Sequence, residues 1–198
     1  MTVAGAAAEP TRADLRRVQI LEAAHKCFSR EGFDAATMAS IAAEAQLSVG
    51  QIYRYFENKE AVIEALCERH LEEWTRRMEE VRARTGDAVE EILEIARFNA
   101  EKLDESGGVS LILEFFAEAA RNPRIGGVVC RVDAAIRNKL RELMQRRGDL
   151  SAAEIDARVM LVCVLIDGWL LRVVKDPTAS KDEYLGALRP VFSAVLAR

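Results

Sequence analysis

The sequence predicts an all-α protein, on three observations. Half of its 198 residues are apolar, and the dominant residue types, Ala, Leu, Glu and Arg, favour helices. Alternating runs of β-branched residues, which would indicate strands, do not occur. Helix-start patterns alternate with glycine and proline breakers along the chain. Together they predict about nine helices, expected over residues 12–31, 37–44, 48–54, 58–84, 87–104, 109–121, 124–147, 151–175 and 181–197.

The first expected helix, over residues 12–31, has one apolar face. Its members recur at helical spacing and include Ile20, Leu21, Ala24 and Phe28. Gly32 followed by Phe33 ends the helix in the manner of a glycine C-cap. This helix can therefore share a small core with the two helices that follow it.

Residues 37–59 form the most informative segment of the chain, TMASIAAEAQLSVGQIYRYFENK. Thr37 can cap a short helix through its hydroxyl. The apolar face of that helix comprises Met38, Ile41, Ala42 and Ala45. Ser48 followed three residues later by Gln51 is a capping-box pattern, so a second short helix is expected next. Two short helices joined by a tight turn predict a helix-turn-helix.

The segment over residues 17–66 resembles the N-terminal domain of TetR-type transcriptional regulators. The motifs that carry the resemblance are ILEAA, F-x-x-x-GF, T-M-x-x-IA, LS-x-G-x-IY-x-YF and NKE. Gln46 departs from the family pattern, which usually has glycine in the turn, where a left-handed backbone costs other residues roughly 1 kcal/mol. The resemblance implies a DNA-binding domain over residues 11–57 and an effector-binding and dimerisation domain over residues 58–198. Residues 1–10 are expected to form a disordered arm.

The second helix of the motif is expected to enter the major groove, where its N-terminal residues meet base edges. Gln51 can pair with adenine, Val49 can pack on a thymine methyl group, and Gly50 allows close approach of the backbone. The outer face of the helix is expected to comprise Gln51, Arg54 and Tyr55.

Further residues are expected to hold the DNA backbone. The resemblance assigns phosphate contacts to Tyr53, Arg54, Tyr55 and Lys59. Thr37 and Ser48 can contribute contacts at helix N-termini. The alternatives are simple capping for the two hydroxyl residues, packing between helices for Tyr53, and a solvated surface for Gln51, Tyr55 and Lys59.

Charge near the expected DNA surface is balanced. Residues 1–60 contain seven Lys and Arg side chains against eight Asp and Glu side chains. Only charge within about 8–10 Å of the DNA backbone contributes to phosphate binding, so local placement matters more than the sum. A single copy of the domain should bind nonspecific DNA modestly.

The last two expected helices predict a homodimer. Residues 161–174, LVCVLIDGWLLRVV, are apolar in every direction of a helix, and the final helix also has a broad apolar face. Pairing with a second subunit would bury this surplus in a four-helix interface with two-fold symmetry. The alternative is a core helix buried within one subunit. The stretch is too short to span a bilayer, no secretory signal opens the chain, and four scattered cysteines suit a reducing cytoplasm.

An effector pocket is expected among the middle helices because of the resemblance. The candidate lining residues are Trp74, Met78, Phe98, Asn99, Phe115, Glu118, Asp167 and Trp169. A polar group on an apolar helix is costly unless paired, so the acids among them suit a cationic or polar aromatic ligand. The alternatives are packing in the core for the apolar residues and a structural ion pair with Arg172 or Arg131 for Asp167.

These features predict a ligand-responsive DNA-binding regulator, a repressor that binds a palindromic double-stranded operator as a dimer and is released by a small molecule. The rivals are an effector-independent DNA-binding or protein-interaction module and a small helical enzyme. Neither a G-x-S-x-G nor a phosphate-loop motif occurs, which disfavours the enzyme. No cofactor and no metal are expected, since Cys67 and His70 bring only two soft ligands together.

Overall fold

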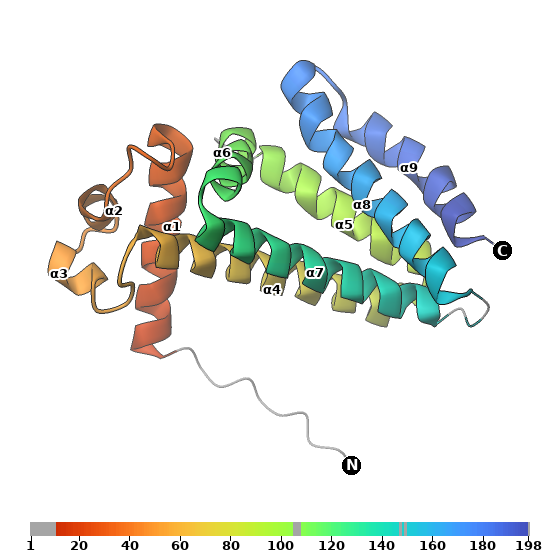
Figure 1. Cartoon of the computed structure of the whole chain (residues 1–198), viewed down its shortest axis with the longest axis horizontal. Helices are drawn as coiled ribbons and strands as arrows, with labels where there is room; N and C mark the ends of the chain where they lie inside the picture. The colour runs from red at the N-terminus through yellow and green to blue at the C-terminus, as the bar shows by residue number, and fades with distance from the viewer. Residues whose placement is uncertain (1–10, 105–107, 147, 149, 198) are drawn as a thin grey trace, which may run out of the picture.

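The computed structural model describes residues 11–104, 108–146, 148 and 150–197, and every regular element in these ranges is a helix (Figure 1). The helices are α1 (Arg12–Glu31), α2 (Met38–Glu44), α3 (Val49–Ile52), α4 (Lys59–Thr85), α5 (Ala88–Asp104), α6 (Gly108–Arg121), α7 (Pro123–Gln145), α8 (Ala152–Lys175) and α9 (Lys181–Leu196). The all-α prediction is confirmed. The expected arm over residues 1–10 lies outside the described residues.

Helix starts follow the capping patterns of the sequence. Reciprocal capping boxes begin four helices, between Thr11 and Asp14, Thr37 and Ser40, Ser48 and Gln51, and Ser151 and Glu154. Each satisfies backbone N–H groups that the first turn of a helix leaves without partners, and a single cap contributes about 1 kcal/mol. Local sequence therefore sets where these helices begin.

The elongated molecule has two ends. Figure 1 places α1, α2 and α3 at one end, and α8 and α9 over the other. We call α1–α3 the three-helix unit. The long helix α4 leaves this unit and packs along its length against α5 and α7. The short helix α6 returns to contact α1.

The core of the three-helix unit continues into the rest of the chain. Its buried side chains include Phe28 of α1, Ile41 of α2 and Ile52 of α3. Leu111 of α6 and Ile125 of α7 belong to the same cluster, and Ile125 is fully buried. Packing therefore crosses the expected domain boundary at residue 58 without a break. A second cluster, built around Trp74, Phe98, Leu140 and Phe192, fills the bundle of α4, α5, α7, α8 and α9.

Gly126 allows α7 to pass close to α6. A Cβ atom on Gly126 would lie 2.8 Å from the backbone oxygen of Ala119, whereas a Cβ on Gly127 would meet only an Arg131 side-chain nitrogen at 3.7 Å. Gly126→Ala should therefore lower the free energy of unfolding by about 1–3 kcal/mol, because the backbone of α6 must shift. Gly127→Ala is the matched control and should be neutral or slightly stabilising. Thermal melts of the two variants test the prediction, and equal melting temperatures would contradict it.

Candidate DNA-binding surface and effector cavity

The turn between α2 and α3 is a Schellman motif. Leu47 N–H donates to Ala42 O at 2.9 Å, and Gln46 N–H donates to Ala43 O at 3.1 Å. The motif requires a left-handed residue at the position of Gln46, whose φ is 56°. The expectation that Gln46 occupies the glycine position of the turn is confirmed.

Gln46→Gly should stabilise the protein. The left-handed conformation costs a residue with a Cβ about 1–2 kcal/mol, and the larger unfolded-state entropy of glycine offsets about 0.5–1 kcal/mol of that gain. The net expectation is an increase of up to about 1 kcal/mol in the free energy of unfolding, measured by urea titration. Gln46→Val, which is stiffer at Cβ, should change stability in the opposite direction. A stability order of Val above Gly would show that the turn is not strained.

One further residue, which sequence reasoning missed, holds the turn against α1. The side-chain amide of Gln19 donates to Ala45 O at 2.7 Å. Gln19 is a polar residue beside the apolar face of α1, and no local pattern separates such a residue from a solvated one. The bond ties the end of α2, where the turn to α3 begins, to α1.

The N-terminal residues of α3 are exposed together. Val49, Gly50 and Gln51 are all accessible, and no atom lies within 4 Å of a Cβ placed on Gly50. The side-chain oxygen of Gln51 accepts from Ser48 N–H at 2.8 Å and from the Ser48 hydroxyl at 3.1 Å. Gln51 therefore caps its own helix, and a two-bond pair with adenine requires this carbonyl to be released. Its amide N–H groups can donate without that change.

The tyrosines after α3 are arranged differently from the expectation. Tyr53 is 52% exposed and Arg54 is also accessible, whereas Tyr55 is half-buried and packs against the core of the three-helix unit. The expected outer face of Gln51, Arg54 and Tyr55 is therefore wrong for Tyr55, and the packing alternative is wrong for Tyr53. The physical reason is that α3 ends at Ile52, so helical spacing no longer decides which side faces solvent.

Lys59, the first residue of α4, is already bound to the loop between α1 and α2. Its ammonium donates to Phe33 O and, at 3.1 Å, to Ala36 O, and lies 4.2 Å from the centre of the Phe33 ring. These contacts fix the loop that precedes the capping residue Thr37. A phosphate contact by Lys59 stays a prediction, and it would have to be made by an ammonium held on carbonyl oxygens.

The expected effector residues do not converge on one site. Trp74, Met78 and Phe98 belong to the second core cluster, and Phe98 is fully buried beneath the guanidinium of Arg77. Trp169 stacks on Tyr184, with ring centres 4.2 Å apart. The helical spacing of these apolar residues predicts that they are buried. Residues in a core and residues in the wall of a pocket are both buried, so the spacing does not separate the two.

The remaining candidates are also dispersed. Phe115 packs against the core of the three-helix unit. Glu118 accepts hydrogen bonds from Arg121 and Asn122, at 3.2 and 3.0 Å, near the end of its own helix. Asn99 is half-buried on α5. None of these side chains lines the cavity described below.

Asp167 makes neither of the expected ion pairs. Arg172 pairs with Asp176 at 3.6 Å, and Arg131 pairs with Glu64. Although Asp167 is an exposed residue, partial burial of its carboxyl and the nearby carboxylate of Asp133 raise its pKa. The ion-pair interpretation of Asp167 is therefore wrong.

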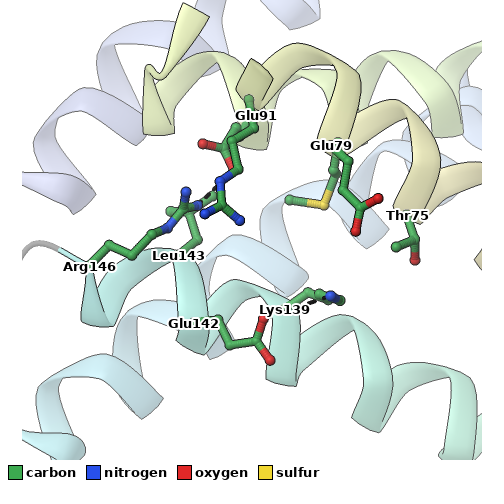
Figure 2. Close-up of a pocket in the computed structure, with 9 residues that line it drawn as sticks. Thr75, Glu79, Glu91, Lys139, Glu142, Leu143 and Arg146 are labelled. Carbon is green, nitrogen blue, oxygen red and sulfur yellow. Dashed lines mark hydrogen bonds and ion pairs between the residues drawn. The ribbon is translucent and has the colours of Figure 1, made fainter. Parts of the chain in front are cut away.

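A cavity of about 200 Å³ lies between α4, α5 and α7 (Figure 2). Its lining residues are Thr75, Met78, Glu79, Arg82, Glu91, Lys139, Glu142, Leu143 and Arg146. Glu91 is only 3% exposed and accepts from Arg146 Nη2 at 2.7 Å. Of the lining residues, sequence reasoning had singled out only Met78. A signal for Glu91 does exist, because this carboxylate lies four residues before Ile95 and seven before Phe98, on the apolar face of the helix.

No helix within residues 11–104, 108–146 and 150–197 is both long and apolar enough to cross a bilayer.

Comparison with known proteins identifies the N-terminal motif. Residues 20–66 match the family described as "Bacterial regulatory proteins, tetR family". The transcriptional regulator UidR of Escherichia coli K12 is 26% identical, over 94% of this chain and 95% of that protein. The nicotine-responsive transcriptional repressor HdnoR of Paenarthrobacter nicotinovorans is also 26% identical, over 86% of this chain and 89% of that protein.

Solved structures share the fold over more than nine-tenths of the chain. GusR of Salmonella enterica superposes with a TM-score of 0.74 at 22% identity, covering 94% of this chain and 97% of that one. The fatty acid degradation regulator FadR of Bacillus halodurans gives a TM-score of 0.70 at 19% identity, covering 92% and 95%. The relatives are transcriptional regulators, and TetR-family regulators bind DNA and small-molecule effectors and form dimers. Residues 20–66 belong to the TetR family, and the relatives along the rest of the chain, together with the shared fold, support a ligand-responsive, DNA-binding transcriptional regulator of that family.

Proposed function

We propose that this chain is a repressor that binds a palindromic operator as a homodimer and leaves it when a small molecule binds. In this proposal residues 11–57 bind DNA, and residues 58–198 bind the effector and the second subunit. The observation that carries it is the placement of two exposed surfaces at opposite ends of the molecule. One is the N-terminal face of α3, and the other is an apolar stripe on α8. Figure 1 shows α3 and α8 at opposite ends.

The DNA surface consists of the accessible residues at and after the start of α3. Val49, Gly50 and Gln51 are placed to meet base edges, and Tyr53 and Arg54 to hold phosphates. Thr37 and Ser48 cap α2 and α3 through their side chains, and in this proposal both also contribute phosphate contacts at the helix starts. Tyr55 supports this surface by packing against the core of the three-helix unit, and Lys59 of α4 supports it by binding the loop before Thr37.

The dimer surface follows one side of α8. Met160, Val164, Leu171 and Val174 are exposed at spacings of four, seven and three residues, and Val164 is 57% exposed. The opposite side, with Val159, Val162, Ile166 and Trp169, is buried in the bundle. The alternative of a helix wholly buried in one subunit is therefore wrong. A second copy would cover the exposed stripe and Val191 of α9. Because large exposed apolar patches mark association sites, this surface is the proposed dimer interface.

The effector domain reaches the DNA-binding unit through several contacts. The helix α4 has Val62 and Ile63 in the first core cluster and Trp74 and Met78 in the second. Across the boundary, Phe33 N–H approaches a Glu114 oxygen at 3.5 Å. A ligand that binds the DNA-free arrangement more tightly needs a coupling of only about 1–3 kcal/mol to release the operator.

Ion pairs add to the same junction. Arg121 of α6 lies 3.7 Å from Asp34, and Arg124 of α7 lies 3.6 Å from Glu57. These charges are exposed and individually weak, so they orient the unit more than they stabilise it. The relatives support the repressor and effector assignments, since HdnoR is named as a nicotine-responsive repressor. The cavity between α4, α5 and α7 favours an effector over the effector-independent module.

Selection of bound duplexes from randomised DNA tests the proposal. The full chain should enrich a palindrome whose half-sites are centred about one helical turn or a multiple of it apart. Mass measurement of the complex should give an even number of subunits per palindrome. Enrichment of a non-palindromic sequence bound by one subunit would contradict the proposal.

A further inference from the structure

We propose that the cavity between α4, α5 and α7 binds a small organic cation, whose positively charged nitrogen pairs with Glu91. The inference rests on the proposed function only in treating this ligand as the effector, because the binding site itself is argued from the structure. Four observations carry it: a cavity, a buried carboxylate in its wall, a displaceable partner on that carboxylate, and apolar side chains beside it (Figure 2).

Glu91 is the buried charge of the cavity. Its side chain is 3% exposed, and in the part of the chain that the structure describes its one ion pair is with Arg146. That bond uses the Oε2 atom, and no hydrogen bond is made to Oε1 within the described residues. Since Glu91 lines the cavity, a ligand N–H group can reach this carboxylate from inside it.

The carboxylate of Glu91 is buried while the cationic side chains of the cavity are more accessible, and this difference favours a cationic ligand over an anionic one. Three cationic side chains also line the cavity, but Arg82 is exposed, and the side chains of Lys139 and Arg146 are 41% and 39% accessible. Solvent screens charges at the mouth, whereas a buried carboxylate interacts strongly with an ion placed beside it. The sign of the buried group therefore decides which ligand is selected.

The other walls fit an organic group of modest size. Met78 of α4 and Leu143 of α7 contribute apolar surface to the cavity. Thr75 donates its hydroxyl hydrogen to Leu71 O at 2.8 Å, so its oxygen can accept a hydrogen bond from a ligand N–H group. A volume of about 200 Å³ is below the range typical of drug-sized ligands, roughly 300–1,000 Å³. A compact amine matches these features.

Binding of a cation exchanges one partner of Glu91 for another. Arg146 directly follows the last residue of α7, and the ligand nitrogen would take its place on the carboxylate. The other end of α7 packs into the three-helix unit through Ile125 and Arg124. Release of Arg146 therefore frees one end of a helix whose other end contacts the DNA-binding unit.

Three aromatic probes of equal size test the charge preference, titrated into the 198-residue protein by calorimetry. Benzylamine is a cation at neutral pH, benzyl alcohol is neutral, and benzoate is an anion. Benzylamine should bind at least about tenfold more tightly than either of the others, the difference expected of a charged hydrogen bond in a buried site. Equal binding of benzoate would overturn the proposal.

Two variants should change benzylamine affinity in opposite directions. E91Q keeps the shape and a hydrogen-bond acceptor for Arg146 but removes the charge, so benzylamine affinity should fall about tenfold or more while benzyl alcohol is unaffected. R146M removes the competing guanidinium, so benzylamine affinity should rise severalfold. E72Q removes an exposed carboxylate of α4 that does not line the cavity and is the matched control, expected to change affinity less than about threefold.

Three further results would overturn the cation site. They are no detectable benzylamine binding to either the wild type or R146M, an unchanged benzylamine affinity in E91Q, and weaker benzylamine binding in R146M. A purely structural role for the Glu91–Arg146 pair predicts that both variants weaken binding. Operator binding is measured separately by gel shift on the same samples. Loss of the cation site with intact operator binding rejects this inference alone, whereas absence of operator binding rejects the proposed function.

Discussion

Val164→Asp should convert the protein from a dimer to a monomer and lower operator affinity at least about a hundredfold. Val164 is 57% exposed at the middle of the α8 stripe, so the variant subunit should fold normally. In the proposed dimer each interface would contain two such carboxylates, and an unpaired charge buried in an apolar interface costs several kcal/mol. A monomer can engage one half-site, whereas a dimer gains the second at a high effective concentration.

Sedimentation velocity and a gel shift on the selected operator measure the two effects. Phe116→Asp is the matched control, because Phe116 is an apolar residue of α6 that is 50% exposed and lies outside the α8 stripe. The control should remain dimeric. A dimeric Val164→Asp variant with wild-type operator affinity would place the interface elsewhere.

Gly50→Glu should abolish operator binding without destabilising the fold. A Cβ on Gly50 meets no atom within 4 Å, so the chain itself has room for a side chain. Glutamate also suits the first turn of a helix and replaces a residue of poor helix propensity, so stability should rise by up to about 1 kcal/mol. On the DNA the same side chain would add bulk and negative charge where the backbone must approach the bases.

Operator affinity of Gly50→Glu should fall at least about a hundredfold, because the backbone can no longer approach the bases closely and a negative charge is placed beside the DNA. Ala83→Glu adds the same charge at an exposed position near the far end of α4, and should leave operator affinity within about threefold. Fluorescence anisotropy with a labelled operator measures both variants. Retained affinity in Gly50→Glu, at unchanged or higher melting temperature, would remove α3 from the DNA surface.

The helix-turn-helix could be predicted because its signals are local. The capping boxes at Thr37 and Ser48 and the apolar spacing of α2 lie within a few residues of the structure that they specify. The left-handed conformation of Gln46 was also predictable, since the position in the motif demands it. What failed was the extrapolation of helical spacing beyond Ile52, which placed Tyr55 outside and left Tyr53 ambiguous.

The cavity could not be predicted, because its residues meet only through the tertiary fold. Glu91 and Arg146 are 55 residues apart, the first on α5 and the second directly after α7. Lys59 likewise binds carbonyl oxygens more than 20 residues away. An aromatic or methionine residue has the same helical spacing in a core as in a cavity wall. The spacing therefore predicts Trp74 and Phe98 as pocket residues and does not predict Glu91.

The apolar surplus of α8 was predictable, but its direction was not. Residues 161–174 are apolar on all sides, and only the packing of α8 against the bundle separates Val162 and Ile166, which are buried, from Val164 and Leu171, which are exposed. The exposed set defines which substitutions break a dimer without damaging the subunit.

The central claim is that two subunits joined through α8 read one palindromic operator. The most direct measurement compares the affinity of the full-length protein for the selected palindrome with its affinity for a duplex of equal length in which one half-site is scrambled. We predict that the palindrome binds at least about a hundredfold more tightly, and that Val164→Asp removes this difference. Equal affinity of the wild-type protein for the two duplexes would contradict the claim.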